Sequence, residues 1–268
     1  MASFNISCGN ALLTVYQWGN GTNPLLCLHG YGQNGGVFEP IVPILTKEFT
    51  IFAIDFPYHG NSHWLDGDIL KPADLWQVLN RLTSLKNWHI LAFSMGGRVA
   101  LQLYNLYPTH IKQLVLVAPD GVYKNFWQVV STQTNWGNKL FKYTMYKPAW
   151  FKNLVGIAGK SKVVNKSVVK FVNHFLQNQD ERIQLYKRWT VMQLFNPNIS
   201  VITKLLVANS GRLDIVVGKH DRIIVPKKVE KAISSNGKNP NIHLHKVDGG
   251  HQLLNTHHFT FIATLLKH

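Results

Sequence analysis

The sequence predicts an α/β protein with a mostly parallel central sheet and helices on both faces. Residues 24–28 and 89–93 form short, largely apolar segments, which is typical of strands buried on both faces. Segments with helical spacing separate such strands along the chain, as parallel strands require. Loops rich in glycine and histidine follow several of these strands, for example His29-Gly30-Tyr31-Gly32. Open α/β sheets bind ligands at this edge, so we expect the functional residues in these loops.

The first half of the chain contains predicted strands and helices in regular succession. Residues 11–18 alternate loosely and predict an early strand. A helix is predicted over 38–49, although Pro40 and Pro43 interrupt its start. Pro72 suits the first turn of a helix over 72–86. The other predicted elements are strands at 24–28, 50–55 and 89–93 and a helix at 95–107, which Pro108 ends.

The second half continues this pattern after a long interruption. Strands are predicted at 113–118, 213–218 and 242–247, and helices at 226–235 and 252–267. The interruption falls between the strands at 113–118 and 213–218. We therefore predict a core of residues 1–119 and 213–268, with residues 120–212 as an insertion in a single domain.

The composition indicates a globular protein: 46% of the 268 residues are hydrophobic and 15% are charged. No basic segment followed by an apolar run begins the chain, and no apolar stretch approaches the roughly 20 residues that span a bilayer. The two cysteines, Cys8 and Cys27, suggest no disulfide framework. These features predict a cytoplasmic protein. Without metal-ligand spacing, a P-loop or a dinucleotide fingerprint, we expect no metal and no cofactor.

The net charge of +15 is concentrated in the predicted insertion. Residues 121–212 contain 14 Lys and Arg against two acids, which gives +12, whereas the rest has 14 basic and 11 acidic residues. The same segment holds 14 of the 31 aromatic residues. The positive charge is therefore a property of one segment and requires its own explanation.

Ser94 lies on the predicted turn between the strand at 89–93 and the helix that follows it. Its neighbours are small: Ala92 two residues before, and Gly96 and Gly97 after it. This is the pattern of a nucleophile elbow, in which a strained turn exposes the serine hydroxyl above the sheet edge. The alternative is a serine that only caps the helix.

Three predicted strand ends carry a serine, an acid and an imidazole in the order Ser94, Asp221 and His251. Here the sequence resembles the α/β-hydrolase superfamily, in its lid-bearing esterase and lipase branch. The matching motifs are His29-Gly30, the segment 55–62, the Ser94 elbow, Gly218-Lys219-His220-Asp221 and Gly249-Gly250-His251. The departures are Ala92 in the elbow and Tyr58 where many members have glycine.

The resemblance implies an α/β-hydrolase fold with a helical lid and a role for each motif. Ser94 is the expected nucleophile, His251 the base, and Asp221 the acid that orients the imidazole, with Asp120 as the alternative acid. The backbone N–H groups of Tyr31 and Met95 are the implied oxyanion hole. His29, Gly30, Ala92, Gly96 and Gly97 are expected to support these loops. Asp55 and His59 are likewise expected to stabilise a loop.

The basic insertion falls where the family places a lid. Its helical spacing at 163–176 puts Lys162, Lys166 and Lys170 on one polar side. The simplest interpretation is a lid whose aromatic residues form its own small core and whose lysines are solvated. The sharper one is recognition of an anionic substrate, with Arg98, Arg188 (or Arg182) and Trp189 as candidate contacts, or of an anionic membrane surface. No nucleic-acid-binding fold is visible.

The sequence thus predicts a serine hydrolase that cleaves a carboxylic ester through an acyl-enzyme intermediate. Its expected partner is a small acyl substrate with an apolar part. Other chemistry on the same scaffold is the alternative within enzymes: thioester, amide or carbon–carbon bond hydrolysis, acyl transfer or a lyase reaction. A binding protein without catalysis is the alternative outside them, because a fold alone does not define an activity. A serine at the elbow disfavours the dehalogenase and epoxide hydrolase branches, which use aspartate there.

Overall fold

The computed structural model describes residues 2–151, 153–154 and 178–267. The chain divides into two compact units. We call them the core unit (Met1–Leu65, Leu70–Lys124 and Phe195–His268) and the insert unit (Asp66–Ile69 and Asn125–Leu194). In the described ranges, no helix is both long enough and apolar enough to cross a membrane.

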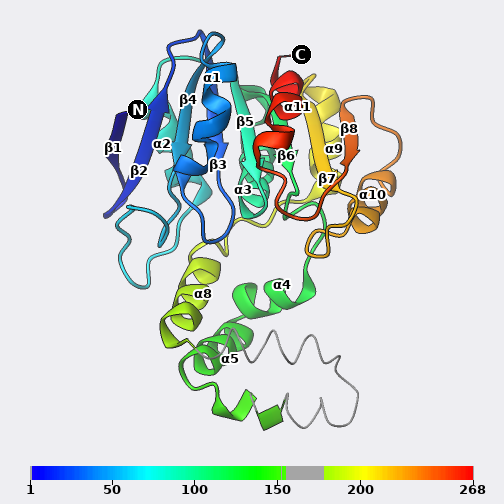
Figure 1. The fold of residues 1–268 in the computed structure, drawn as a ribbon. Coiled ribbons are helices and arrows are strands. Elements are labelled where there is room, and N and C mark those ends of the chain that lie inside the picture. Colours follow the sequence, from blue (N-terminus) through cyan, green and yellow to red (C-terminus); the bar gives the residue numbers. More distant parts are fainter. Residues whose placement is uncertain (1, 152, 155–177, 268) are drawn as a thin grey trace. The chain divides into compact units, whose positions relative to one another are not determined.

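The core unit is built on a sheet of eight strands, whose layers are visible in Figure 1. The strand order is β1-β2-β4-β3-β5-β6-β7-β8; β1 and β2 pair antiparallel with each other, β2 pairs antiparallel with β4, and the remaining pairs are parallel. The strands are β1 (Ala2–Cys8), β2 (Ala11–Trp18), β3 (Asn23–Leu28), β4 (Phe49–Ile54), β5 (Trp88–Phe93), β6 (Ile111–Val117), β7 (Arg212–Gly218) and β8 (Ile242–Val247). Every residue of β4 and β5 is buried, as expected for central strands covered on both faces.

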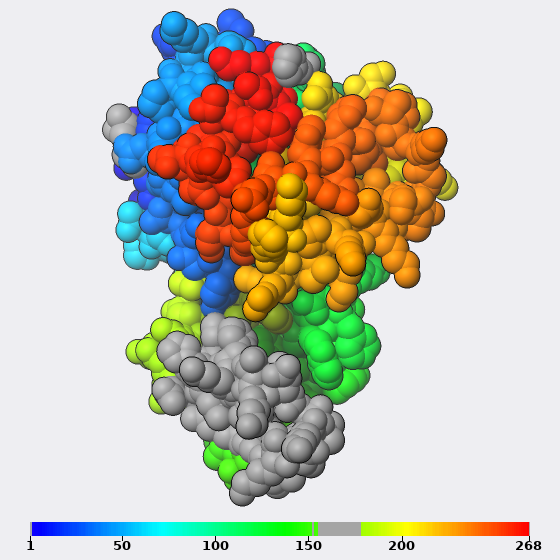
Figure 2. Space-filling model, turned by 45° about the vertical axis from the view of Figure 1, so that its right-hand side comes forward, coloured from blue at the N-terminus to red at the C-terminus, as the bar shows by residue number. Residues whose placement is uncertain are grey.

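Helices cover both faces of this sheet (Figure 1). The short 3-10 helix η1 (Gly35–Ile41), α1 (Val42–Leu45) and α11 (Thr256–Leu266) pack on one face, around an apolar cluster that includes Phe38, Leu91 and Ile262. The other face carries α2 (Pro72–Leu82), α3 (Met95–Leu106) and α9 (Ile199–Ala208). The remaining core helices are η2 (Pro108–His110) and α10 (Pro226–Ser234). In Figure 2, the orange surface, to which α10 and β8 contribute, borders the red surface of the C-terminal segment.

The region predicted as one helix over 38–49 folds differently. A 3-10 helix ends at Ile41, a single α-helical turn follows, and Phe49 already begins β4. Pro40 and Pro43 explain the break, because each lacks the N–H that a continuous helix needs. Strand β1 was not predicted from the sequence; it is an exposed edge strand in which Phe4, Ile6 and Cys8 alternate with polar residues.

The insert unit contains the helices α4 (Phe126–Gln133), α5 (Asn135–Tyr146) and α8 (Gln179–Val191) among its described residues. Phe141 of α5 packs against Tyr186 and Trp189 of α8, with ring centroids 5.6 and 5.8 Å apart. Aromatic residues thus form an internal contact of this unit. The predicted helix at 163–176 lies outside the described residues.

The compact insert unit ends at Leu194, whereas the predicted insertion runs to residue 212. Helix α9 packs against α3, so the compact core already includes the chain from Phe195 onward. The reason is its apolar surface: Ile202 and Leu206 are fully buried. The role of the insert unit as a lid stays a prediction.

Candidate active site

Ser94 lies between β5 and α3 in a left-handed conformation, with φ 49° and ψ −114°. A residue with a side chain rarely adopts a positive φ, and its surroundings must hold it there. The Ser94 N–H donates to the Val117 carbonyl at 3.0 Å, and the Ser94 carbonyl accepts from the N–H groups of Gly97 and Asp120 at 2.9 Å each. Three backbone hydrogen bonds thus fix the turn that presents the hydroxyl.

The close approach of neighbouring backbone explains the small residues around this turn. A Cβ on Gly96 would lie 2.2 Å from the Leu28 carbonyl oxygen, and one on Gly97 would lie 2.6 Å from the Cβ of Pro119. Ala92 is fully buried in β5, between Leu28 of β3 and Leu116 of β6. Larger side chains at the two glycines require the strands and loops around them to move apart.

The structure brings Ser94, His251 and Asp221 together in one hydrogen-bonded series. Ser94 Oγ lies 3.0 Å from His251 Nε2, and His251 Nδ1 lies 2.8 Å from Asp221 Oδ2. The other carboxylate oxygen of Asp221 accepts from the N–H groups of Ile223 at 2.7 Å and Ile224 at 2.9 Å. The Asp221 side chain is fully buried, and 13% of the His251 side chain is exposed.

The chemistry of these partners assigns the hydrogens. A carboxylate accepts hydrogen bonds, so Nδ1 of His251 donates to Asp221. In a neutral imidazole, Nε2 is then the acceptor for the Ser94 hydroxyl. This is the arrangement in which an imidazole can remove the proton of a serine during nucleophilic attack.

The sheet topology explains why residues so distant in sequence meet. Ser94, Asp221 and His251 follow β5, β7 and β8, whose carboxyl ends share one edge of the sheet. Glycines let the last two loops approach each other, because a Cβ on Gly218 would lie 2.2 Å from the Gly250 carbonyl oxygen. The adjacent Gly249 has φ 145°, a conformation that side chains rarely adopt.

The loop after β3 is held by a buried histidine. Nδ1 of His29 donates to the Gly30 carbonyl at 2.7 Å, and Nε2 accepts from the Phe56 N–H at 3.0 Å. Gly30 leaves no room for a side chain, since a Cβ would lie 2.8 Å from Cδ1 of Phe93. His29 thus ties the loop that carries Tyr31 to the start of the loop after β4.

Met95, the other residue of the expected oxyanion hole, is the first residue of α3. The first N–H groups of an α-helix have no acceptor within the helix, so they can bind an external oxygen. The ring of Tyr31 lies edge-on to His59, with centroids 5.9 Å apart. Tyr31 follows β3 and Met95 follows β5, so both residues lie at the edge of the sheet where the carboxyl ends of these strands meet.

Asp55 organises the loop after β4. Its buried carboxylate accepts from the Gly35 N–H at 2.6 Å, the Asn61 N–H at 2.9 Å and the Tyr16 hydroxyl at 3.2 Å. The same loop explains the departure at Tyr58, whose φ of 60° is a conformation that glycine adopts without strain. Tyr16 is a partner of this loop that the sequence does not indicate, because it lies 39 residues before Asp55.

Arg98 and Asp120 form an ion pair beside the elbow. Arg98 is 4% exposed, and its Nε lies 3.4 Å from Asp120 Oδ2. Arg98 is therefore a buried residue paired with Asp120, which favours a structural role for it over the predicted contact with a substrate. The hydrogen-bond partner of His251 is Asp221, so the geometry favours Asp221 over Asp120 as the triad acid.

Arg188 and Trp189, the other candidate substrate contacts, lie on α8 of the insert unit. Both side chains are partly buried, and Trp189 packs against Phe141. Ser94 belongs to the core unit, so contact of these residues with a substrate stays a prediction. Within the described part of the chain, no three His, Cys, Asp or Glu side chains group closely enough to hold a metal ion.

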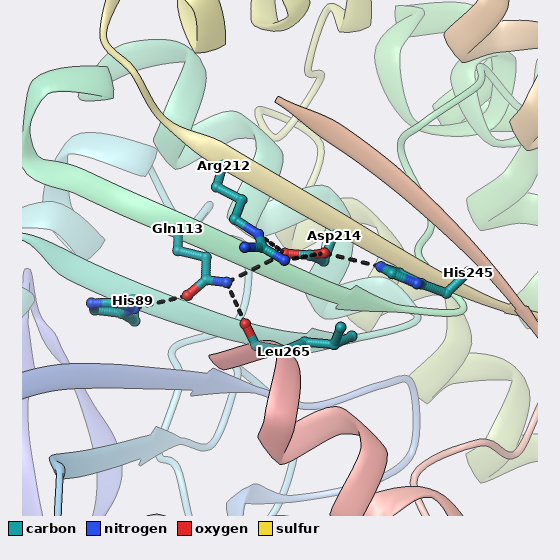
Figure 3. A network of polar contacts seen from close by, with 6 residues as sticks. All are labelled: His89, Gln113, Arg212, Asp214, His245 and Leu265. Carbon is teal, nitrogen blue, oxygen red and sulfur yellow. Dashed lines mark hydrogen bonds and ion pairs between the residues drawn. The ribbon is translucent and has the colours of Figure 1, made fainter. Parts of the chain in front are cut away.

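A second polar cluster lies within the strands, away from the loops that carry the triad (Figure 3). Asp214 accepts from Arg212 Nε at 2.7 Å, from His245 Nε2 at 3.0 Å and from Gln113 Nε2 at 3.3 Å. Gln113 also donates to the Leu265 carbonyl at 2.6 Å and accepts from His89 Nδ1 at 3.1 Å. The cluster therefore links β5, β6, β7, β8 and α11.

Burial changes the proton affinity of two members of this cluster. Burial alone raises the pKa of Asp214, but the hydrogen bonds from Arg212 and His245 outweigh it and hold this pKa below its ordinary value. Burial lowers the pKa of His89 against the effect of its hydrogen bond to Gln113, and the nearby Lys112 lowers it further. Folding thus favours a charged Asp214 and a neutral His89.

Comparison with known proteins agrees with this fold. A family model described as "alpha/beta hydrolase fold" matches residues 23–257, so the chain belongs to this family. A solved thioesterase domain from the curacin biosynthetic pathway has a TM-score of 0.68 at 16% identity, and the match covers 100% of this chain and 99% of that one. The predicted α/β-hydrolase fold is confirmed.

Curated relatives match only part of the chain. A "Serine hydrolase-like protein" of Danio rerio is 40% identical over 103 residues, which cover 37% of this chain and 31% of the relative. A "Pimeloyl-[acyl-carrier protein] methyl ester esterase" of Pseudoalteromonas atlantica is 35% identical over 102 residues, 37% of this chain and 38% of that protein. The matches therefore span less than two fifths of these relatives.

Proposed function

We propose that this protein is a serine hydrolase that cleaves a carboxylic ester through a Ser94–His251–Asp221 triad. The observation that carries the proposal is the hydrogen-bonded series from Asp221 to Ser94, at distances of 2.8 and 3.0 Å, on an elbow with a left-handed serine. A capping serine needs neither the strained turn nor the imidazole. The relatives named as hydrolases and esterases support the same class of reaction.

The proposed reaction has two steps. Ser94 Oγ attacks the ester carbonyl while His251 Nε2 takes its proton, and Asp221 stabilises the resulting imidazolium. The N–H groups of Met95 and Tyr31 bind the oxyanion, and His251 returns the proton to the leaving alcohol as the carbon–oxygen bond breaks. A water molecule then attacks the acyl carbonyl while His251 takes its proton, and His251 passes this proton to Ser94 Oγ as the bond to the acyl group breaks and the acid leaves.

The proposed substrate is a small acyl ester with an apolar part, and an anionic group would suit the basic insertion. One named relative acts on a methyl ester carried by an acyl-carrier protein, which supports an ester as the scissile bond. Thioester or amide cleavage and acyl transfer use the same acyl-enzyme, so they remain alternatives of the same site. A cytoplasmic location is part of the proposal, and the two buried free thiols, Cys8 and Cys27, support it.

The test is labelling with a fluorophosphonate, followed by mass spectrometry of the intact protein, with turnover of p-nitrophenyl esters in parallel. We expect one adduct and measurable turnover in the wild type and neither in Ser94→Ala. Ser235→Ala, which removes an exposed serine hydroxyl far along the chain, is the matched control and keeps both. An unlabelled, folded wild type contradicts the proposal and favours a binding protein.

We also propose that the insert unit contacts an anionic membrane surface. On α5, Trp136, Leu140 and Tyr143 are 65%, 45% and 53% exposed, and their spacing puts them on one side of the helix. Lys139 and Lys142 are exposed beside them. Exposed aromatic side chains flanked by lysines are typical of helices that lie on anionic lipid.

Sedimentation with liposomes tests this contact. We expect binding to vesicles with anionic lipid at low salt, weaker binding at high salt, and little binding to neutral vesicles. Trp136→Ala should weaken binding without changing ester turnover, whereas Trp64→Ala in the core unit should not weaken it. Equal sedimentation of the wild type and Trp136→Ala, or no binding at low salt, contradicts the contact.

A further inference from the structure

Tyr123 contacts the loop that carries the triad acid. It follows β6, at the end of the second segment of the core unit, and its side chain is partly buried. The Tyr123 hydroxyl lies 3.4 Å from the Ile223 carbonyl, to which it donates, and 3.3 Å from the Val225 N–H, from which it accepts. Lys228 Nζ lies 5.7 Å from the centre of the Tyr123 ring. Three contacts thus join one side chain to residues 223–228.

One peptide group connects these contacts to the triad. The carbonyl of Ile223 and the N–H of Ile224 belong to the same peptide bond. Its carbonyl accepts from Tyr123, and its N–H donates to Asp221 Oδ1 at 2.9 Å. A hydrogen-bonded series therefore runs from Tyr123 through this peptide to Asp221, His251 and Ser94.

We propose that Tyr123 is a positioning residue for the triad: its hydroxyl fixes the 223–225 backbone that holds the Asp221 carboxylate against His251. The proposal rests on the proposed function, because it assigns Tyr123 a role in that same site. Donation to the Ile223 carbonyl also polarises the peptide and strengthens its N–H as a donor to Asp221.

The exposure of the loop explains why such a tether matters. The Ile223 side chain is 66% exposed, and this loop forms the gold surface in Figure 2. Ile224 is 7% exposed and packs inward. An exposed backbone segment with few buried side chains opens easily, so polar contacts decide its position.

Tyr123 is also suited to donate over a wide pH range. Burial raises the pKa of its hydroxyl, and the nearby carboxylates of Asp120 and Asp221 raise it further against the effect of the Val225 N–H. The hydroxyl therefore keeps its hydrogen wherever a triad with a neutral histidine can work.

The first test is Tyr123→Phe, which keeps the ring and removes both hydrogen bonds. Loss of neutral hydrogen bonds of this kind predicts a kcat about three- to tenfold lower. The KM should stay within about twofold, because the hydroxyl acts on Asp221 and not on the substrate. The matched control is Tyr104→Phe, which removes a buried hydroxyl 3.5 Å from the Leu205 carbonyl, away from the triad loops. We expect its kcat to equal that of the wild type.

The second test is a double-mutant cycle with Asp221→Asn, measured as the rate of fluorophosphonate labelling. If Tyr123 acts through Asp221, Tyr123→Phe causes no further loss in the Asp221→Asn background. The same loss in both backgrounds, or a wild-type kcat in Tyr123→Phe, overturns the proposal.

If Tyr123→Phe folds poorly, a second variant tests the same contact from the other side. Val225→Pro removes the N–H that Tyr123 accepts from, and the Val225 φ of −66° already suits proline. It should lower kcat in the wild-type background and not in Asp221→Asn. Ser94→Ala distinguishes a failure of the proposed function from a failure of the Tyr123 proposal. Full turnover in Ser94→Ala refutes the proposed function. If Ser94→Ala is inactive but Tyr123→Phe and Val225→Pro are unaffected, only the role of Tyr123 is refuted.

Discussion

Among the described residues, two buried aspartates pair with histidines across the same two neighbouring strands, β7 and β8. Asp214 of β7 and His245 of β8 lie 3.0 Å apart within the sheet, and Asp221 and His251, in the loops after these strands, lie 2.8 Å apart. Both carboxylates are fully buried, and both histidines are partly exposed. The distance between acid and imidazole therefore does not distinguish them.

Their remaining partners do. Asp214 also accepts from both Nε and Nη2 of Arg212 and from Gln113, so its charge is neutralised inside the sheet. Asp221 accepts from two backbone N–H groups, and the second nitrogen of its histidine faces Ser94. The ring of His245 instead packs against Phe261. An aspartate–histidine pair becomes a candidate catalytic pair through the nucleophile and the sheet edge, not through the pair itself.

The largest expected effect is a loss of kcat when the aspartate of the Asp221–His251 pair is changed, which the Asp214–His245 pair should not show. Asp221→Asn should lower kcat by about 10⁴-fold, because an amide neither holds the correct imidazole tautomer nor stabilises the imidazolium. The unfolding transition in urea should change little by comparison. Steady-state turnover of a p-nitrophenyl ester measures the loss.

The control for this variant is Asp120→Asn, the acid that the sequence left as an alternative. We expect a far smaller loss of kcat, since Asp120 pairs with Arg98. If Asp120→Asn is inactive and Asp221→Asn stays active, the assignment of Asp221 as the triad acid is wrong. The Asp221–His251 pair is then no more catalytic than the Asp214–His245 pair.

The next effect concerns stability. Asp214→Asn should lower the free energy of unfolding by about 1–3 kcal/mol, less than for a fully buried ion pair, because Arg212 is 32% exposed and can reach water. The kcat per folded molecule should stay within about threefold, since stability and chemistry involve different residues here. Urea denaturation and ester turnover on the same samples measure both.

Asp248→Asn is the matched control, because its carboxylate is 85% exposed and pairs with His220 at the surface. We expect no change in its urea midpoint. A loss of kcat in Asp214→Asn as deep as that in Asp221→Asn would show that the two pairs act together.

The sequence predicted the parts of the site that depend on local order. Gly96, Gly97 and Gly249 mark backbone that must turn sharply or approach closely, and strand ends place Ser94 and His251 at one edge. These residues could be predicted from the sequence because a parallel sheet brings the carboxyl ends of distant strands together.

The other parts of the structure, such as the Asp214 cluster and the contacts of Tyr123, depend on strand register and tertiary packing, which a short sequence motif does not predict. The Asp214 cluster forms because β6, β7 and β8 align in one register, and the sequence around it shows only isolated polar residues in apolar strands. Tyr123 was missed for the same reason: its partners are backbone atoms a hundred residues away.

A smaller effect appears when the pH is lowered. The native pKa of His89 is depressed from 6.5, so below about this pH the unfolded chain binds a proton that the native state resists. The native pKa of Asp214 is also depressed, from 3.8, so a second loss follows as the pH falls below that value. Both groups thus make the protein less stable in acid than at neutral pH. Urea midpoints between pH 7 and pH 3 measure this decline.

His89→Gln isolates the first part of this decline. Glutamine does not titrate, so the dependence of unfolding free energy on pH between 7 and 5 should become shallower by at most about 1.4 kcal/mol per pH unit. Identical slopes for the wild type and His89→Gln would show that His89 titrates alike in both states.

The smallest expected effect is the loss of unfolding free energy in His245→Gln, and a comparison with His251→Gln distinguishes the two histidines as chemical groups. In the sheet, His245 Nε2 only donates to Asp214, and a glutamine amide can do the same. His245→Gln should therefore cost less than about 1 kcal/mol of unfolding free energy, a typical value for one exchanged hydrogen bond. In the loop, His251 must accept a proton from Ser94, which an amide does not do, so His251→Gln should lose activity like Asp221→Asn. Urea unfolding and ester turnover of both variants complete the comparison; a stable but inactive His245→Gln would mean that the cluster within the sheet positions the triad.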